Sequence, residues 1–208
     1  KKAKAIHERG LTIDTHVDIP GTAAYATPAL DPGNATNLKC DLPKMKAGGL
    51  DAVFLAVYVG QRPELNAEGY KRAYDQAMAG FDALDRLTKL HPELCELART
   101  PADVERIAKT GKRVILTGVE NGYPMGDDFA NLKTFFDRGA RYLTLVHSSN
   151  NQLAATSTRR EGEDTGLTEL GKKTVAEMNR LGRMVDVSHA SAKSFWDAFF
   201  EIFGKFRR

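Results

Sequence analysis

Five short segments rich in β-branched and apolar residues alternate with helical patterns, and this alternation limits the fold more than any other feature of the chain. Each segment has the length and apolarity of a parallel strand that is buried on both faces. Strands that alternate with helices predict a parallel sheet with right-handed crossover connections. The predicted strands are residues 11–19, 52–59, 113–119, 141–147 and 184–188.

Helical patterns with recognisable start and stop signals fill most of the intervals between these strands. The signals are apolar side chains at every third or fourth position, an N-cap followed by proline, and glycine where a left-handed C-cap residue is expected. A longer loop rich in Gly, Asn and Pro is predicted at residues 21–40. The predicted helices are residues 66–90, a helix that begins at Thr100 and Pro101 and closes at Gly111, and residues 128–138 and 168–181, which end at Gly139 and Gly182.

Two architectures fit this order, a doubly wound sheet and a closed (β/α)8 TIM barrel. The first strand is not followed by the Gly-x-Gly-x-x-Gly turn of a dinucleotide-binding sheet. Polar residues capable of chemistry follow several strands, which is where barrels place their active sites. The sequence therefore favours the α/β (β/α)8 TIM barrel.

The length of the chain is a further constraint on the barrel. A complete barrel has eight strands and about 250 residues, whereas this chain has 208 residues and five predicted strands. We therefore predict the first five βα units, with one partial barrel domain at residues 1–198 and an atypical Phe-rich basic tail at residues 199–208. The apolar face through Phe195, Phe199, Phe203 and Phe206 has two interpretations, the helix that follows the fifth strand or an altered end with an exposed surface.

Histidines and carboxylates occupy the ends of four predicted strands. His16 and Asp18 are two residues apart, so the strand period places both side chains on one face. Glu120 follows the third strand, where a carboxylate is costly unless it is paired or bound to a cation. His147 ends the fourth strand and His189 ends the fifth.

Each of these residues also has a purely structural interpretation, as a hydrogen-bonded pair, a solvated loop residue or a satisfied core histidine. Their recurrence at equivalent strand ends favours a metal site instead. A mixed set of imidazole and carboxylate ligands suits Zn²⁺ or a similar divalent ion, and a bridging carboxylate would give a dinuclear hydrolytic centre. Hydrolysis of an amide is the natural use of such a centre. His7 and His91 lie in helical or loop settings and are assigned no role.

Charge, hydropathy and cysteine content further limit the classes of protein to which the chain could belong. Thirty Lys and Arg against 27 Asp and Glu give a formal charge of +3, spread without a basic block, which argues against a nucleic-acid partner. No apolar run approaches the roughly 20 residues of a membrane span. Cys40 and Cys95 are predicted to be unpaired thiols, with one disulfide as the alternative.

Five motifs stand in one order along the chain: DTHVDIP at residues 14–20, GVENG at 118–122, RYLTLVHSSN at 141–150, a Gly-Leu-Thr to Leu-Gly segment at 166–182, and VDVSH at 185–189. Together they resemble the successive motifs of the renal (membrane) dipeptidase family, the M19 metallopeptidases. The resemblance runs from about residue 10 to about residue 197, and the combination is far more specific than any single motif.

The resemblance implies an amidohydrolase-type barrel with two zinc ions. On the family pattern, His16 and Asp18 bind one metal, Glu120 bridges both, and His189 binds the second. His147 would contact the substrate and stabilise the oxyanion of the tetrahedral intermediate, so that Glu120 and His147 are the implied catalytic residues. Family members cleave dipeptides, often with a D-residue or dehydro-residue on the C-terminal side, and some open β-lactams.

The family pattern continues after His189 with a second metal-binding His, a substrate-binding Arg and an acid/base Asp, none of which lies in this chain. Two alternatives to a dipeptidase therefore stay open, another metal-dependent amidohydrolase acting on a cyclic amide or lactone, and a non-catalytic fragment that associates with another chain. A homodimer is a further expectation. The absence of an initial Met and the resemblance to exported bacterial members favour a periplasmic or secreted location over a cytoplasmic one.

Overall fold

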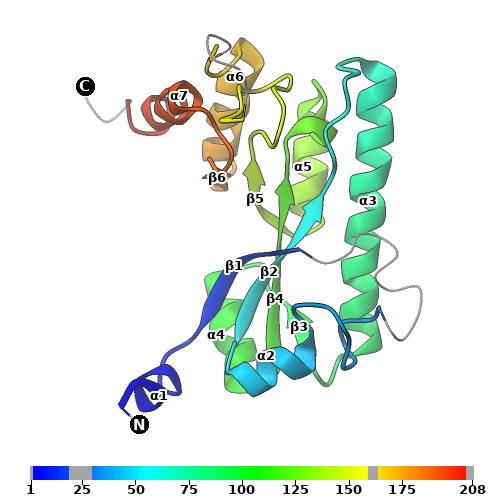
Figure 1. Cartoon of the computed structure of the whole chain (residues 1–208), viewed down its shortest axis with the longest axis vertical. Coiled ribbons are helices and arrows are strands. Elements are labelled where there is room, and N and C mark those ends of the chain that lie inside the picture. Colours follow the sequence, from blue (N-terminus) through cyan, green and yellow to red (C-terminus); the bar gives the residue numbers. More distant parts are fainter. Residues whose placement is uncertain (1, 19–29, 159–163, 205–208) are drawn as a thin grey trace. The chain divides into compact units, whose positions relative to one another are not determined.

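The computed structural model describes residues 2–18, 30–158 and 164–204 as an alternation of strands and helices (Figure 1). All the strand pairs whose register is defined are parallel. In chain order the elements are α1 (Lys2–His7), β1 (Ile13–Asp18), α2 (Leu42–Gly48), β2 (Ala52–Tyr58), α3 (Ala67–Leu90), β3 (Cys95–Leu97), α4 (Pro101–Lys109), β4 (Arg113–Glu120), the 3₁₀ helix η2 (Tyr123–Met125), α5 (Phe129–Asp137), β5 (Ala140–Thr144), α6 (Glu169–Arg180), β6 (Met184–Asp186) and α7 (Ala192–Phe203).

The chain divides into two compact units. The first comprises residues 1–57 and 79–118, and the second comprises residues 58–78 and 119–208. In the first unit the strand order is β1-β2-β4, and β3 pairs with β4. All residues of β2 except the last are buried, as expected for a strand covered on both faces.

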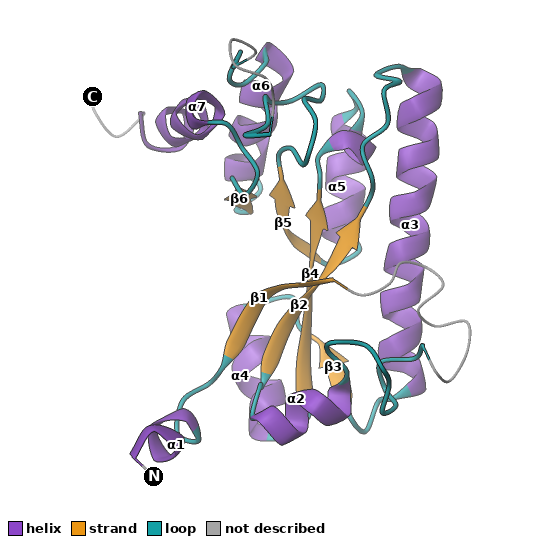
Figure 2. Ribbon diagram, viewed as in Figure 1, coloured by secondary structure: helices purple, strands orange, loops and turns teal. Residues whose placement is uncertain are grey.

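The second unit contains the end of β4 and the strands β5 and β6. β5 and β6 pair in register from Tyr142 opposite Met184 to Thr144 opposite Asp186. Helix α5 packs on β5, α6 packs on β6, and α7 packs on α6 (Figure 2). This unit therefore presents the carboxyl ends of three strands together with the loops that follow them.

The predicted helix boundaries are confirmed by the cap geometry. Thr100 forms a reciprocal capping box with Asp103, and Pro101 occupies the first turn of α4. Thr168 caps α6 by accepting a hydrogen bond from the backbone N–H of Gly171. Gly139 and Gly182, which follow the C-caps of α5 and α6, have φ angles of 118° and 65°. Local start and stop signals thus decide where these helices begin and end.

Two predicted strands end two or more residues earlier than the sequence pattern indicated. β5 ends at Thr144 and β6 at Asp186, so that His147 and His189 lie in the loops that follow, contrary to the prediction that each histidine ends its strand. The hydrogen-bonded ladder stops there because the Leu145 carbonyl and the Ser188 N–H bond to side chains instead of to the neighbouring strand. Ser188 donates its backbone N–H to the Asp186 carboxylate over 2.9 Å, and Asn151 donates its amide to the Leu145 carbonyl over 2.9 Å.

Four short elements of the described residues were absent from the prediction, α1, α2, β3 and η2. The predicted loop at 21–40 is described only from residue 30, and residues 30–40 contain no helix or strand. Ile19, the predicted last residue of the first strand, lies outside the described residues.

Helix α7 runs without interruption across the predicted boundary between residues 198 and 199. It follows the last strand, which agrees with the interpretation of the Phe-rich segment as a helix of the α/β pattern. Phe206 lies outside the described residues. Five aromatic side chains of α7 are exposed and contact one another: Phe195, Trp196, Phe199, Phe200 and Phe203.

Among the residues that the structure describes, no helix combines the length and the apolarity that crossing a membrane requires. Both cysteines are free thiols, as predicted. Burial raises the pKa of the Cys95 thiol to about 12, so this side chain stays protonated near neutral pH and is a poor nucleophile.

Asp41 is a buried, hydrogen-bonded carboxylate of the first unit, and its loss is expected to destabilise the fold. Its buried side chain accepts hydrogen bonds from the Lys44 backbone, the Lys44 ammonium and Thr36. Burial alone would raise the pKa of Asp41, but these bonds outweigh it and lower the pKa from 3.8 to about 2. Because the folded chain favours the charged form, the stabilisation is present above pH 4 and lost as the pH falls towards 2, an effect of about 2 kcal/mol.

We expect Asp41→Asn to lower the free energy of unfolding by about 2 kcal/mol at pH 7, with the difference from wild type shrinking between pH 4 and pH 2. Urea unfolding at several pH values measures this. Asp75→Asn is the control because it removes only an exposed pair with Lys71, which is worth less than about 1 kcal/mol. A constant difference across the pH range would contradict the expectation.

Candidate metal centre

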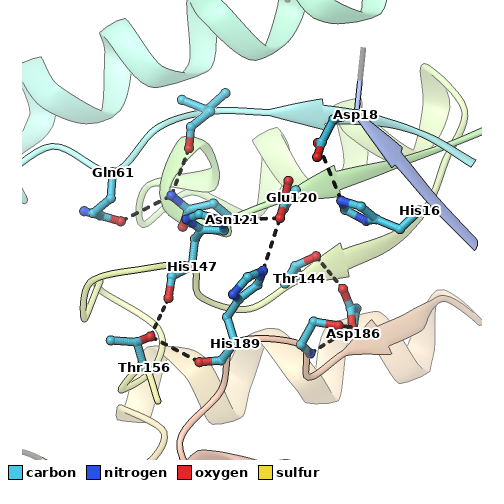
Figure 3. A network of polar contacts seen from close by, with 12 residues as sticks. His16, Asp18, Gln61, Glu120, Asn121, Thr144, His147, Thr156, Asp186 and His189 are labelled. Carbon is cyan, nitrogen blue, oxygen red and sulfur yellow. Dashed lines mark hydrogen bonds and ion pairs between the residues drawn. The ribbon is translucent and has the colours of Figure 1, made fainter. Parts of the chain in front are cut away.

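Three side chains of the second unit, Glu120, His147 and His189, converge beyond the carboxyl ends of β4, β5 and β6 (Figure 3). The Nε2 atoms of His147 and His189 lie 3.4 Å and 3.3 Å from the same oxygen, Oε1 of Glu120. The two imidazole centroids are 4.3 Å apart. One candidate ligand atom from each side chain lies within 4.8 Å of the other two. The structure therefore brings three of the five predicted site residues into one cluster.

The donor atoms of this cluster fit a divalent metal ion. The His189 imidazole and the Glu120 carboxylate are ligand types that Zn²⁺ and similar ions accept, and the His147 imidazole lies next to the same carboxylate oxygen. Ligand atoms about 2.1 Å from a tetrahedral ion lie about 3.4 Å apart, and the separation between His189 and Glu120 matches this spacing. Glu120 is only 5% exposed, and burial of a carboxylate is costly without a compensating cation or hydrogen bonds.

Glu120 is held in place by the turn that follows it. The apolar residues of β4 are buried up to the end of the strand, and Asn121 then reverses the chain with a φ angle of 80°. The Asn121 amide donates to the Val59 carbonyl over 3.0 Å and accepts from Asn151 over 3.0 Å. Since Asn151 also donates to the Leu145 carbonyl, these two amides join the loops that follow β2, β4 and β5.

The two histidines are oriented by their own neighbours. The Tyr58 ring, at the end of β2, lies against His147 with 4.9 Å between the ring centroids. Asp186 accepts a hydrogen bond from Thr144 over 2.6 Å and fixes the turn into His189 through Ser188. His189 itself has a φ angle of 63°, a conformation uncommon for residues other than glycine.

His16 and Asp18 belong to the first unit, at the end of β1. The His16 Nε2 atom lies 3.7 Å from Oδ1 of Asp18, and Figure 3 shows the two side chains facing each other. The register of β1 against β2 shifts between Asp14 and Val17, and bulges of this kind commonly aim a side chain near a functional site. The combination of all five residues in a single centre stays a prediction.

The histidines that were assigned no role have structural partners. His7 contacts the Gly48 carbonyl at 3.1 Å, and His91 pairs with Asp31 at 2.7 Å. Sequence reasoning missed Tyr58, Asn121 and Asn151 as supports of the cluster. Tyr58 carried a signal, because it is the one hydroxyl-bearing residue at the end of an otherwise apolar strand. Asn121 stands in the GVENG motif but was given no role there, and Asn151 had no distinguishing pattern.

Comparisons with known sequences find relatives that are dipeptidases. The sequence model of the membrane dipeptidase family, peptidase family M19, matches residues 1–201. The dipeptidase tcpJ of Claviceps purpurea (strain 20.1) is 35% identical over 162 residues, which are 76% of this chain and 38% of that protein.

Solved structures agree in fold. The probable dipeptidase PvdM from Pseudomonas aeruginosa superposes with a TM-score of 0.85 at 28% identity, over 95% of this chain and 51% of that chain. A metallo peptidase from Rhodobacter sphaeroides, liganded with a phosphinate mimic of the dipeptide L-Ala-D-Ala, gives a TM-score of 0.76 at 25% identity, over 90% of this chain and 61% of that chain. The chain thus spans about 40 to 60% of the length of these relatives.

These similarities confirm the predicted fold class. The chain is an α/β protein whose parallel strands match part of the barrel of M19 dipeptidase structures. Of the six strands in residues 2–18, 30–158 and 164–204, five correspond to the predicted ones and one is the three-residue strand β3.

Proposed function

The chain belongs to the membrane dipeptidase family, peptidase family M19, and on this premise we propose that it supplies metal-binding residues for the hydrolysis of the peptide bond of dipeptides. The observation that carries the proposal is the convergence of His147 and His189 on one oxygen of the buried Glu120. The names of the relatives support the same reaction class.

Two Zn²⁺ ions are the proposed cofactors. His16 and Asp18 would bind the first ion, Glu120 would bridge both, and His189 would bind the second. The family resemblance supports this assignment, as does the position of each residue at or just beyond the carboxyl end of a parallel strand, where barrel enzymes carry their sites.

A divalent ion supplies Lewis acidity, which polarises a carbonyl group and lowers the pKa of water. The chain itself contributes orientation and charge. Glu120 provides a fixed negative charge in a buried setting, and His147, which lies beside Glu120 but is not among the proposed zinc ligands, would donate a hydrogen bond to the carbonyl oxygen on which negative charge develops. The Tyr58 ring restrains the His147 imidazole by ring contact, so that the donor is already aimed before the substrate arrives.

A dipeptide with a D-residue on its C-terminal side is the proposed substrate class. The Rhodobacter sphaeroides relative is liganded with a phosphinate mimic of L-Ala-D-Ala. The tetrahedral phosphorus of a phosphinate resembles the tetrahedral carbon formed when water adds to an amide, and enzymes bind such mimics more tightly than substrates.

The experiment is a hydrolysis assay with L-Ala-D-Ala, L-Ala-L-Ala, a β-lactam and a lactone. It uses both the 208-residue chain and the complete product of its gene, after chelation and after addition of Zn²⁺. We expect the complete product to release free alanine only with metal, and to prefer the dipeptides. Hydrolysis that survives chelation would refute the metal proposal, and activity confined to the β-lactam or the lactone would refute the dipeptide assignment.

Two further expectations concern the oligomeric state and the cellular location of the protein. We propose self-association as a homodimer, which the exposed aromatic side chains of α7 support, and light scattering that gives a monomer mass would exclude it. The periplasmic or secreted location stays a prediction, which fractionation of the source cells would test.

A further inference from the structure

The hydroxyl group of Thr156 lies between the backbone carbonyls of the two cluster histidines (Figure 3). Its Oγ1 donates to the His147 carbonyl and lies 3.1 Å from the His189 carbonyl. The next residue, Ser157, donates its backbone N–H to the same His189 carbonyl over 2.8 Å. Thr156 and Ala190 also form an isolated antiparallel bridge. One short segment therefore contacts the backbone of both histidines.

The position of this hydroxyl is itself fixed. Thr156 is only 1% exposed, and its backbone N–H donates to the Asn150 side chain over 2.8 Å. A few residues earlier, Asn151 accepts from the backbone of Leu153 and Ala154. The hydroxyl is thus presented from a loop that is folded back on itself and bonded internally.

The two histidines need such an external support because neither lies in a strand. Both follow the last ladder residue of their strands, and His189 has a φ angle of 63°. A residue in this conformation persists when surrounding contacts over-determine it. Because each carbonyl is covalently tied to the Cα that bears the imidazole, restraint of the two carbonyls limits how far the rings can move relative to each other.

We propose that Thr156 is a positioning residue that sets the spacing of His147 and His189 around Glu120. The inference rests on the proposed function, since the spacing matters only if the cluster binds a metal. A hydroxyl shared between two carbonyls couples the loop after β5 to the loop after β6. Its loss removes the hydroxyl donor from the His147 carbonyl, leaves the His189 carbonyl with the Ser157 N–H alone, and frees the rings from their common restraint.

The test compares Thr156→Val, Thr156→Ala and Thr156→Ser in the full chain. Val keeps the branched shape and removes the hydroxyl, whereas Ser keeps the hydroxyl and removes the methyl group. We expect Val and Ala to weaken Zn²⁺ affinity about 10- to 100-fold, the range found for residues that orient metal ligands. Ser should stay within about threefold of wild type, because it retains the donor.

Two readouts separate positioning from a general loss of stability. The visible absorption of the Co²⁺-loaded chain reports ligand geometry. It should therefore change in Thr156→Val and Thr156→Ala and match wild type in Thr156→Ser. Hydrogen exchange of the Ser157 amide in the metal-free chain should accelerate in the same two variants. Thr174→Val is the matched control, because Thr174 is also buried but donates to Leu170 within α6, and it should keep wild-type affinity and spectrum.

The outcomes distinguish failure of the proposed metal-binding function from failure of the positioning role of Thr156. If wild type binds no Zn²⁺, the proposed function fails. If wild type binds Zn²⁺ and Thr156→Val binds it equally well with an unchanged Co²⁺ spectrum, the positioning role is overturned while the function stands. Should Val not fold, the Ala and Ser variants decide, because equal losses in both would assign the effect to the methyl group and overturn the role of the hydroxyl.

Discussion

Replacing Glu120 with Gln is expected to abolish Zn²⁺ binding by the cluster of Glu120, His147 and His189. Gln has nearly the same shape but carries no charge, and its NH₂ group is a donor facing two imidazole Nε2 atoms. Removal of residues that merely orient ligands costs 10- to 100-fold in metal affinity, so loss of the charged ligand itself should exceed about 100-fold, or about 2.7 kcal/mol.

The folded chain should tolerate this change without metal. Glu120 is buried, and removing a buried charge while keeping the volume is often neutral or stabilising. We therefore expect the metal-free variant to unfold at or slightly above the wild-type temperature. Saturating Zn²⁺ should raise the midpoint of wild type and leave that of Glu120→Gln unchanged, because a ligand stabilises only the state that it binds.

Equilibrium dialysis and thermal unfolding measure both effects. Glu177→Gln is the control, since Glu177 is a carboxylate of the same unit that pairs with Arg180 at the surface. This control should bind Zn²⁺ like wild type. Equal Zn²⁺ affinity in Glu120→Gln and wild type would show that the cluster is not a metal site.

From the apolar pattern of the sequence, it was easier to predict which residues are buried than to predict which residues pair in strands. Leu145 and Val146 are both fully buried, so the run of apolar residues correctly indicated the interior. The ladder nevertheless ends at Thr144, because the carbonyls of Leu145, His147 and Ser148 bond to side chains of the following loop. Those partners lie six to ten residues away in the sequence, and hydrophobic periodicity contains no information about them.

Short elements escaped prediction for a different reason. β3 has three residues and α2 has seven, which is too few for a period to be recognised. The start of α2 did carry a local signal, with Asp41 as N-cap and a proline in the first turn, of the kind that correctly located α4. Capping chemistry is therefore more informative than periodicity for helices of one or two turns.

The residue types of the candidate site were predictable, whereas their supports were not. Histidines and carboxylates at strand ends are conspicuous because they are out of place on apolar strands. Thr156 and Asn151 act through hydrogen bonds to backbone carbonyls and amides, and Thr156 reaches a residue 33 positions away. A threonine or asparagine in a polar loop is ordinary, so only the three-dimensional structure distinguishes these two.

Gly171→Ala is expected to be among the most destabilising single substitutions in the second unit. A Cβ at this position would lie 2.1 Å from the Leu153 carbonyl oxygen and 3.0 Å from its carbon. Both atoms belong to the backbone, so no side-chain rotation relieves the clash. Overpacking of this kind costs about 1 to 3 kcal/mol and sometimes more.

The clash also affects the Leu153 carbonyl, whose hydrogen bond with Thr168 attaches α6 to the loop that follows β5. Thr168, the N-cap of α6, donates its backbone N–H to the same Leu153 carbonyl over 2.9 Å. Leu153 in turn donates its backbone N–H to Asn151, which holds the turn after Glu120 through Asn121. Displacement of the loop should therefore weaken Zn²⁺ affinity as well as the fold.

Urea unfolding and Zn²⁺ titration of Gly171→Ala test both consequences, with Gly48→Ala as the matched control. A Cβ at Gly48, in α2, meets nothing within 4 Å, so alanine there should be neutral or stabilise the chain by about 0.5 to 1 kcal/mol. If Gly171→Ala unfolds at the wild-type urea concentration, α6 must shift away from the loop at little cost. If it is destabilised but binds Zn²⁺ like wild type, the chain of contacts from Leu153 to Glu120 does not control the cluster.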